Sequence, residues 1–252
     1  MISASKRTDF HSSRLTRVLA DMALVKPAVS GQMFAQQLGQ WLGLHDAIRL
    51  RAVHTRGVPM ASSELACAAG PEIRDAVDRV RLSLMDLIAQ RACPGTDPLD
   101  LRASPIKPTA SGQVPATFEP YRRSYLALQR DMELRTQPLR AQARALLAKG
   151  SPALRQLAAL DAVLDDALAE RESRLLAQVP NLLQTRFEQL RAASRKSAVE
   201  GQLTDDLAAG AMGWLACFGD ELRTVLLAEL DLRLQPVIGL IEALDNEVTQ
   251  TQ

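Results

Sequence analysis

The stretch ELRTVLLAELDLRLQPVIGLIEALDNEV, residues 221–248, decides the fold class of this chain. Its apolar residues recur every three or four positions, a spacing that places side chains on one face of an α-helix. From Leu234 onward the spacing alternates between three and four, as in the seam of a coiled coil. Pro236 lies inside the pattern and is expected to bend the helix, because it lacks a backbone donor. The stripe consists of Leu222, Leu226, Leu230, Leu234, Val237, Ile241, Leu244 and Val248.

The composition of the whole chain favours helices in the same way. Leu occurs 40 times and Ala 38 times among 252 residues, whereas Val and Ile together occur 21 times and aromatic residues make up 4%. Helices favour Leu and Ala, while strands favour β-branched and aromatic side chains. We therefore predict an all-α fold and exclude an all-β one. Hydrophobic residues make up 47% of the chain, enough to bury a core, so a chain disordered throughout is also excluded.

Two further long helices are predicted in the second half. The first covers residues 119–149 and carries Pro138 as a kink. The second follows the pair Ser151–Pro152, a capping residue and a proline suited to a first helical turn, and is expected to bend at Pro180. Its apolar residues show the same coiled-coil-like alternation and are Leu157, Leu160, Leu164, Leu168, Leu175, Val179, Leu183, Phe187 and Leu190.

Three shorter helices are predicted in the first half, each marked by one apolar stripe. They begin near Ser13, Gln32 and Pro71, and the first is expected to end at Lys26–Pro27. The stripes are Leu15, Val18, Leu19 and Met22; then Phe34, Leu38, Trp41, His45, Ile48 and Ala52; then Ile73, Val77, Val80, Leu84 and Leu87.

A proline-rich segment separates the two halves. Residues 93–117 contain five prolines and two glycines and keep no apolar periodicity. A structureless loop of this length is unusual inside a compact domain, so it is typical of a linker. We predict an N-terminal helical unit at 10–92, a linker at 93–117 and a long-helix hairpin or bundle at 118–248.

Charge is unevenly distributed although the chain carries a net charge of only +1. Residues 121–150 hold 7 basic and 2 acidic residues, whereas residues 204–252 hold 2 basic and 9 acidic ones. One interpretation is that both segments are simply solvated faces. The other is that the acidic last helix lies against the basic 121–150 helix, within one chain or between two, which would set their pairing and orientation.

The sequence predicts a cytoplasmic protein that does not insert into a membrane. The longest uncharged apolar run, residues 207–219, rises about 20 Å as a helix, which is short of the roughly 30 Å hydrocarbon core of a bilayer. The first residues contain no apolar run of signal-peptide length. The three cysteines are far apart and form no CxxC pair, which favours reduced thiols.

No pattern in the sequence indicates a reaction. Its histidines are His11, His45 and His54, and none has metal-ligand neighbours at the spacing of a zinc motif. The acidic cluster over residues 161–172 lacks the histidine of two-metal carboxylate bundles, so we expect surface pairing with the nearby Arg155, Arg171 and Arg174. We therefore predict no catalytic, cofactor or metal site and no enzyme activity.

Two hypotheses for the function remain. The first is an interaction or scaffold protein that associates with itself or with a helical partner. Its contact stripe would be Leu222, Leu226, Leu230, Leu234, Val237, Ile241 and Leu244. The alternative is a nucleic-acid-associated protein that grips phosphates with helix 121–150, through Arg122, Arg123, Arg130, Arg135, Arg140 and Arg144.

Several stretches resemble a family of proteobacterial proteins, the domain of unknown function numbered 3348. They are FAQQLGQWLG (34–43), YLALQR (125–130), LAALDAVLDD (157–166), RFEQLR (186–191) and AELDLRLQP (228–236). The resemblance covers nearly the whole chain apart from the linker. It implies no known activity and no functional residue. It also implies a place on the cytoplasmic side of an envelope assembly, because genes of this family are thought to lie beside genes for envelope proteins.

Overall fold

The architecture is all-α, as the composition predicts. The computed structural model describes residues 13–25, 39–55, 70–92, 117–199 and 207–250, and these form helices and no strand. In chain order the helices are α1 (Arg14–Asp21), α3 (Leu44–Thr55), α5 (Gly70–Arg91), α7 (Glu119–Leu147), α8 (Pro152–Leu176), α9 (Val179–Val199) and α10 (Leu207–Gln250).

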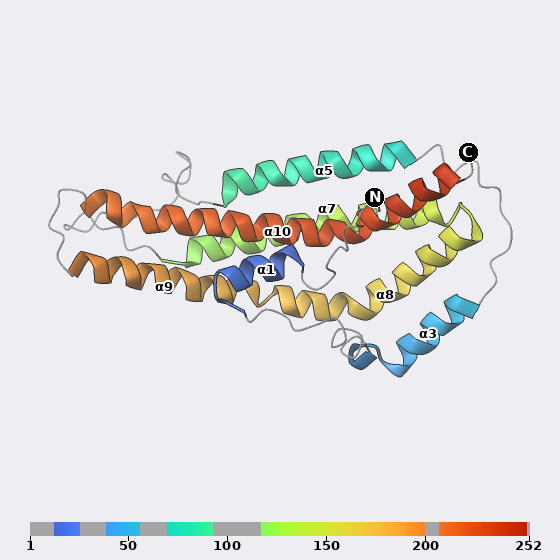
Figure 1. The fold of residues 1–252 in the computed structure, drawn as a ribbon, viewed down its shortest axis with the longest axis horizontal. Coiled ribbons are helices and arrows are strands. Elements are labelled where there is room, and N and C mark those ends of the chain that lie inside the picture. The colour runs from blue at the N-terminus through green and yellow to red at the C-terminus, as the bar shows by residue number, and fades with distance from the viewer. Residues whose placement is uncertain (1–12, 26–38, 56–69, 93–116, 200–206, 251–252) are drawn as a thin grey trace, which may run out of the picture.

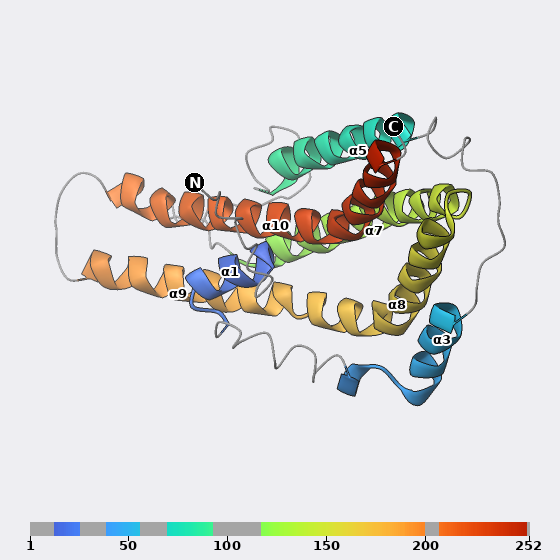
Figure 2. The ribbon, with the colours of Figure 1, turned by 45° about the vertical axis from the view of Figure 1, so that its right-hand side comes forward.

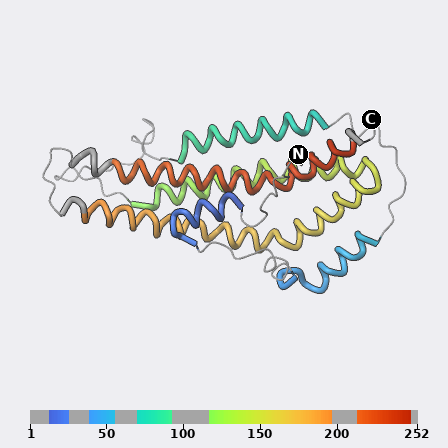
Figure 3. The backbone as a smooth tube through the Cα atoms, in the orientation of Figure 1, coloured from blue at the N-terminus to red at the C-terminus, as the bar shows by residue number. Residues whose placement is uncertain are grey.

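The longest helix, α10, is the centre of the bundle. It packs against α1, α5, α7 and α9, and Figure 1 shows it running along most of the molecule between α5 and α9. α7 and α8 form an antiparallel hairpin, and α9 continues in the direction of α8, as the backbone trace shows (Figure 3). α3 lies on the outside, where it packs against α8.

Serine side chains define two helix starts that the sequence predicts. Ser13 Oγ accepts a hydrogen bond from the backbone N–H of Thr16 at 3.2 Å, and Ser151 Oγ accepts one from Leu154 at 3.3 Å. Each bond satisfies one of the free donors at a helix N-terminus.

α1 ends at Asp21, earlier than the predicted end at Lys26–Pro27. The backbone N–H of Ala23 bonds to Ala20 O and that of Leu24 bonds to Leu19 O, which together make a Schellman motif. Ala23 adopts a left-handed φ of 57° at the position that usually holds glycine. The predicted helix end was wrong because Ala23, rather than a recognisable glycine, occupies the left-handed position of this motif.

The prolines act on the long helices in different ways. Pro138 lies inside α7 without ending it. Pro236 also lies inside α10, and the last part of α10 turns toward α5, as Figure 2 shows. Around Pro180 the expected bend is a break instead, because α8 ends at Leu176 and α9 begins at Val179.

The two halves of the chain share one hydrophobic core. Leu15 of α1 and Leu84 of α5 belong to the same cluster of buried residues as Leu128 of α7 and Leu226 of α10. The N-terminal unit predicted at 10–92 therefore does not build a separate core within the described residues. Most of the linker predicted at 93–117 lies outside them.

An aromatic cluster joins α7, α9 and α10 near one end of the bundle. Phe187 lies 5.1 Å, between ring centroids, from both Trp214 and Phe218. Tyr121 lies 5.3 Å from Phe218, and the contacts of Phe218 with Tyr121 and Phe187 are both edge-to-face. Such geometry is favourable for aromatic rings beyond the area they bury.

The second predicted helix differs most from expectation. The described part is interrupted at Leu42–Gly43, and α3 then has no fully buried side chain. The half-buried residues of α3 that follow helical spacing are Asp46, Arg49, Leu50 and Val53. The predicted stripe of His45, Ile48 and Ala52 is exposed instead, because α8 covers the neighbouring face.

A shared core predicts one cooperative unfolding transition. Leu84→Ala is expected to lower the free energy of unfolding by about 2–5 kcal/mol, because Leu84 is fully buried and its loss leaves a cavity. The matched control Leu82→Ala, on the exposed face of the same helix, should change it by about 0.5 kcal/mol or less. Urea denaturation followed by circular dichroism checks this. Two separate transitions, with only one shifted by Leu84→Ala, would contradict a common core.

Candidate interaction surfaces

The stripe predicted as a partner surface lies in the core of the single chain. Each of its residues is 5% exposed or less. The packing of the chain's own helices accounts for this stripe, so the predicted role in binding a partner needs correction and a contact surface has to lie on the outside. The buried residues are Leu222, Leu226, Leu230, Leu234, Val237, Ile241 and Leu244.

The acidic residues of α10 pair with three other helices. Asp231 forms ion pairs with Arg14 of α1 and, at 3.3 Å, with Arg81 of α5. Asp245 pairs with Arg74 of α5, and Glu221 pairs with Arg186 of α9 at 2.6 Å. The predicted packing of α10 against α7 is present, but the described ion pairs of these acids do not use the arginines of α7.

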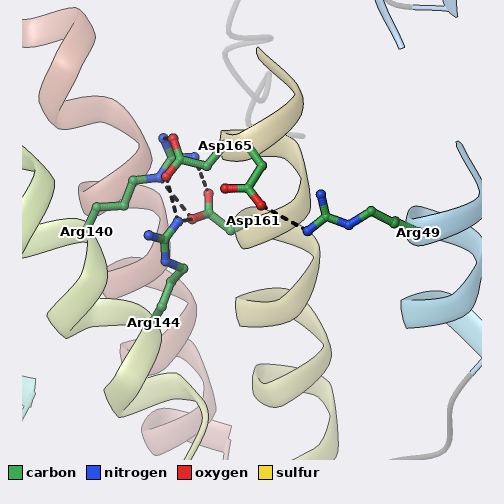
Figure 4. Close-up of polar contacts among 6 residues, drawn as sticks. Arg49, Arg140, Arg144, Asp161 and Asp165 are labelled. Carbon is green, nitrogen blue, oxygen red and sulfur yellow. Dashed lines mark hydrogen bonds and ion pairs between the residues drawn. The ribbon is translucent and has the colours of Figure 1, made fainter. Parts of the chain in front are cut away.

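Two arginines of α7 instead pair with two aspartates of α8. Arg140 donates two hydrogen bonds to Asp161, at 3.0 and 2.6 Å, and one to Asp165 at 2.6 Å. Arg144 Nη1 contacts both carboxylates, at 3.2 and 2.8 Å, and Figure 4 shows the four side chains converging between the helices. The quartet has no net charge, and its side chains are only 13–27% exposed.

The quartet stabilises the charged form of its central arginine. Burial disfavours a charged Arg140, but its hydrogen bonds to Asp161 and the charges of both aspartates outweigh burial, so the pKa of Arg140 is raised. Such bidentate arginine–carboxylate bonds fix geometry as well as charge. The quartet therefore sets how α7 and α8 face each other.

The arginines of the nucleic-acid hypothesis do not converge on one surface. Arg140 and Arg144 belong to the quartet, and Arg135 donates to Ser83 Oγ of α5 at 2.9 Å. Arg123 lies 3.8 Å from Glu119 on its own helix. Arg122 and Arg130 are exposed. Nucleic-acid binding by this helix stays a prediction that the geometry does not favour.

A buried carboxylate connects α7 and α10. Glu229 is fully buried, and its oxygens accept hydrogen bonds from Tyr125 Oη at 2.5 Å and from Gln129 Nε2 at 3.0 Å. Arg233, one turn along α10, donates two bonds at 2.9 and 3.0 Å and balances the charge. Burial and the negative charge of Glu229 raise the pKa of the Tyr125 hydroxyl well above its ordinary value.

The same glutamine also reaches the break between α8 and α9. Pro180 has no N–H to donate to the carbonyl of Leu176, four residues earlier. Gln129 Nε2 lies 3.3 Å from that oxygen and donates to it instead. One side chain of α7 thus contacts both the end of α8 and the buried carboxylate of α10.

A groove of about 690 Å³ lies beside this network, between α1, α7, α8 and α10. Its lining includes Gln129 and Arg233, the exposed leucines Leu126 and Leu175, and Trp41. Arg171 stacks on the Trp41 ring at 4.2 Å from its centroid. The groove therefore combines an apolar wall with charged groups of both signs.

Large apolar side chains are also exposed elsewhere: Leu134 of α7 is 65% exposed, and α3 and α5 each expose a neighbouring pair. Leu44 and Ile48 of α3 are 80% and 58% exposed. Leu82 and Met85 of α5 are 61% and 38% exposed. Each pair is spaced so that both side chains share one helix face.

The groups with potential chemistry are separate from one another. Cys217 and His45 are exposed on different helices, α10 and α3. Among the residues that the structure places, no three histidine, cysteine or carboxylate groups lie together as a metal site. Within the same residues no helix has the length and apolar character needed to cross a bilayer. His11, Cys67 and Cys93 lie outside the described ranges.

The comparisons with known proteins identify the family. A family model described as protein of unknown function (DUF3348) matches residues 1–246. The chain belongs to the DUF3348 family. No curated protein and no solved structure matches the chain. The match extends over both halves of this DUF3348 chain, as does the hydrophobic core.

Sequence reasoning missed the buried network of this DUF3348 protein. Tyr125 and Gln129 are four residues apart on α7, and Glu229 and Arg233 are four apart on α10. The available signal was a glutamate between Leu226 and Leu230, inside a leucine stripe. A charged residue in such a place requires a partner when the stripe is buried.

The raised pKa of Tyr125 predicts a pH dependence of stability. Below about pH 10 the hydroxyl is protonated in both states, and Tyr125→Phe should lower the free energy of unfolding by about 1–3 kcal/mol through the lost hydrogen bond. Above about pH 10 the unfolded chain releases this proton while the folded chain keeps it, so wild-type stability falls. The difference in free energy of unfolding between the wild type and Tyr125→Phe should therefore shrink as the pH of the urea melts rises from about 8 to 11. A difference that does not change with pH would contradict the raised pKa of Tyr125.

The quartet predicts unequal effects for two neighbouring aspartates. Asp161→Asn should lower the free energy of unfolding by about 1–3 kcal/mol, because Arg140 keeps its charge at the helix contact and loses a bidentate acceptor. Asp166→Asn is the matched control, since Asp166 is 65% exposed and its one ion pair among the described residues is with Arg49, which is 40% exposed. Such pairs contribute about 0.2–1 kcal/mol. Thermal and urea unfolding of both variants measure the difference. Equal effects would contradict a structural role for the quartet.

Proposed function

We propose that this protein is a non-enzymatic helical interaction protein that associates with itself or binds a helical partner. The observation that supports this is the exposure of large apolar residues on α3 and α5, after the core has buried the long leucine stripes. Water-exposed apolar faces on a helix are favourable places for another helix to pack.

The surroundings of these faces support the same proposal. α3 contacts the bundle through half-buried side chains and through polar bonds such as Arg49 to Asp166 at 2.9 Å, which leaves a whole helix face uncovered. The groove beside Glu229 has charges of both signs and offers no cluster of groups that favours one reaction. We further propose, from the family resemblance, that the protein acts in the cytoplasm, on the inner side of an envelope assembly.

The direct test is the mass of the full chain in solution. Size-exclusion chromatography with light scattering, from about 1 to 100 µM, should give a mass that rises above the 27.5 kDa of the monomer. In-cell cross-linking with mass spectrometry then shows whether the contacts join copies of this chain or another helical protein. A protein that stays monomeric at every concentration and forms no specific cross-link would overturn the proposal.

A further inference from the structure

We propose that copies of this chain associate head to tail, with the exposed face of α3 in one copy packed on the exposed face of α5 in the next. The inference rests on the proposed function and names its two contact surfaces. The α3 face is formed by Leu44, Ile48, Arg51 and Ala52, and the α5 face by Asp78, Leu82, Met85 and Asp86.

The α3 face is apolar and basic. Leu44, Ile48 and Ala52 are four residues apart and form one stripe on the side of α3 that α8 does not cover. Arg51 is the one arginine, lysine or carboxylate among the exposed residues of α3, and it has no ion pair within the described chain. The other two charged residues of the helix are half-buried and already bonded, because Arg49 pairs with Asp166 of α8 and Asp46 accepts the N–H of Gly43 at 3.1 Å.

The α5 face is apolar and acidic. Three arginines of α5 form ion pairs across the bundle, and they are Arg74 with Asp245, Arg81 with Asp231 and Arg91 with Asp131. The remaining charges of α5 have no ion pair within the described chain, and they are Glu72, Asp75, Asp78 and Asp86 with a single basic residue, Arg79. Leu82 and Met85 lie among these acids, so the face offers an apolar centre with a negative rim.

Charge complementarity selects contact between the two different faces. Pairing the α5 face with the same face of a second copy would bring Asp78 and Asp86 against the same two acids. Pairing α3 with α3 would give Arg51 no carboxylate. Packing α3 on α5 places Leu44 and Ile48 against Leu82 and Met85, so both apolar pairs are covered. The same contact brings the positive charge of Arg51 to the acidic residues at the edge of the α5 face.

The positions of the helices allow this contact to repeat. Figures 1 and 2 place α5 and α3 on opposite sides of the bundle. One copy can therefore use its α3 face and its α5 face at the same time. A heterologous contact of this kind does not stop at the dimer, and it builds rings or open chains.

The experiment uses two variants that each block one face. Ile48→Glu places a carboxylate in the α3 face, and Leu82→Glu places one in the α5 face. Because both positions are exposed, the variants should fold as the wild type does by circular dichroism. In sedimentation velocity the wild type should grow past the dimer with concentration, and each variant alone should associate at least about tenfold more weakly.

An equimolar mixture of the two variants provides the decisive measurement. Ile48→Glu keeps an intact α5 face and Leu82→Glu keeps an intact α3 face, so the mixture should form a one-to-one dimer and grow no further. The matched control Leu175→Glu, at a 52% exposed leucine of α8 outside both faces, should assemble like the wild type. A charge exchange adds a second test: Arg51→Glu should weaken association, and mixing it with Asp86→Arg should restore contact.

The outcomes separate this inference from the proposed function. If the mixture stays monomeric, if either variant assembles like the wild type, or if either variant alone forms a dimer as strong as that of the wild type, head-to-tail contact is wrong while helix-mediated association stands. If the wild type itself is monomeric throughout and forms no cross-link, both are wrong.

Discussion

The hydrogen bonds to the buried carboxylate of Glu229 are the constraint on which the bundle depends. A fully buried charge is costly unless charged and polar groups surround it, and here Tyr125, Gln129 and Arg233 supply the donors. Rotating α7 or α10 by one residue would separate these groups. The hydrogen bonds of this network and the aromatic cluster of α7, α9 and α10 therefore favour one register of a core that is otherwise rich in leucine and alanine.

The same network holds α8 and α9 in place. Pro180 interrupts the helix and leaves the Leu176 carbonyl without its usual donor, and Gln129 replaces that donor. The bond ties the break to α7, which the Arg140–Asp161 bonds also join to α8. Polar contacts therefore specify the positions of four helices around a core that is otherwise apolar.

Helix type and approximate position follow from the sequence, whereas the neighbours of each helix do not. Spacing of Leu and Ala predicts that α5, α7 and α10 are amphipathic, and Ser13 and Ser151 mark helix starts, because these are local properties. Which side of α3 is covered depends on α8, which lies about a hundred residues later in the chain. This is why Ile48 is exposed rather than buried. The pairing of Asp161 with Arg140 and the burial of Glu229 depend in the same way on contacts that no local pattern contains.

The attachment of α3 has a consequence for how this protein evolves. The helix adds no fully buried side chain to the core and is held by half-buried side chains and a few exposed hydrogen bonds, so most of the folding free energy resides elsewhere. Substitutions on its outer side change shape and charge there with little effect on whether the chain folds. If the outer side of α3 is the contact surface proposed above, its specificity can change independently of the stability of the bundle beneath it.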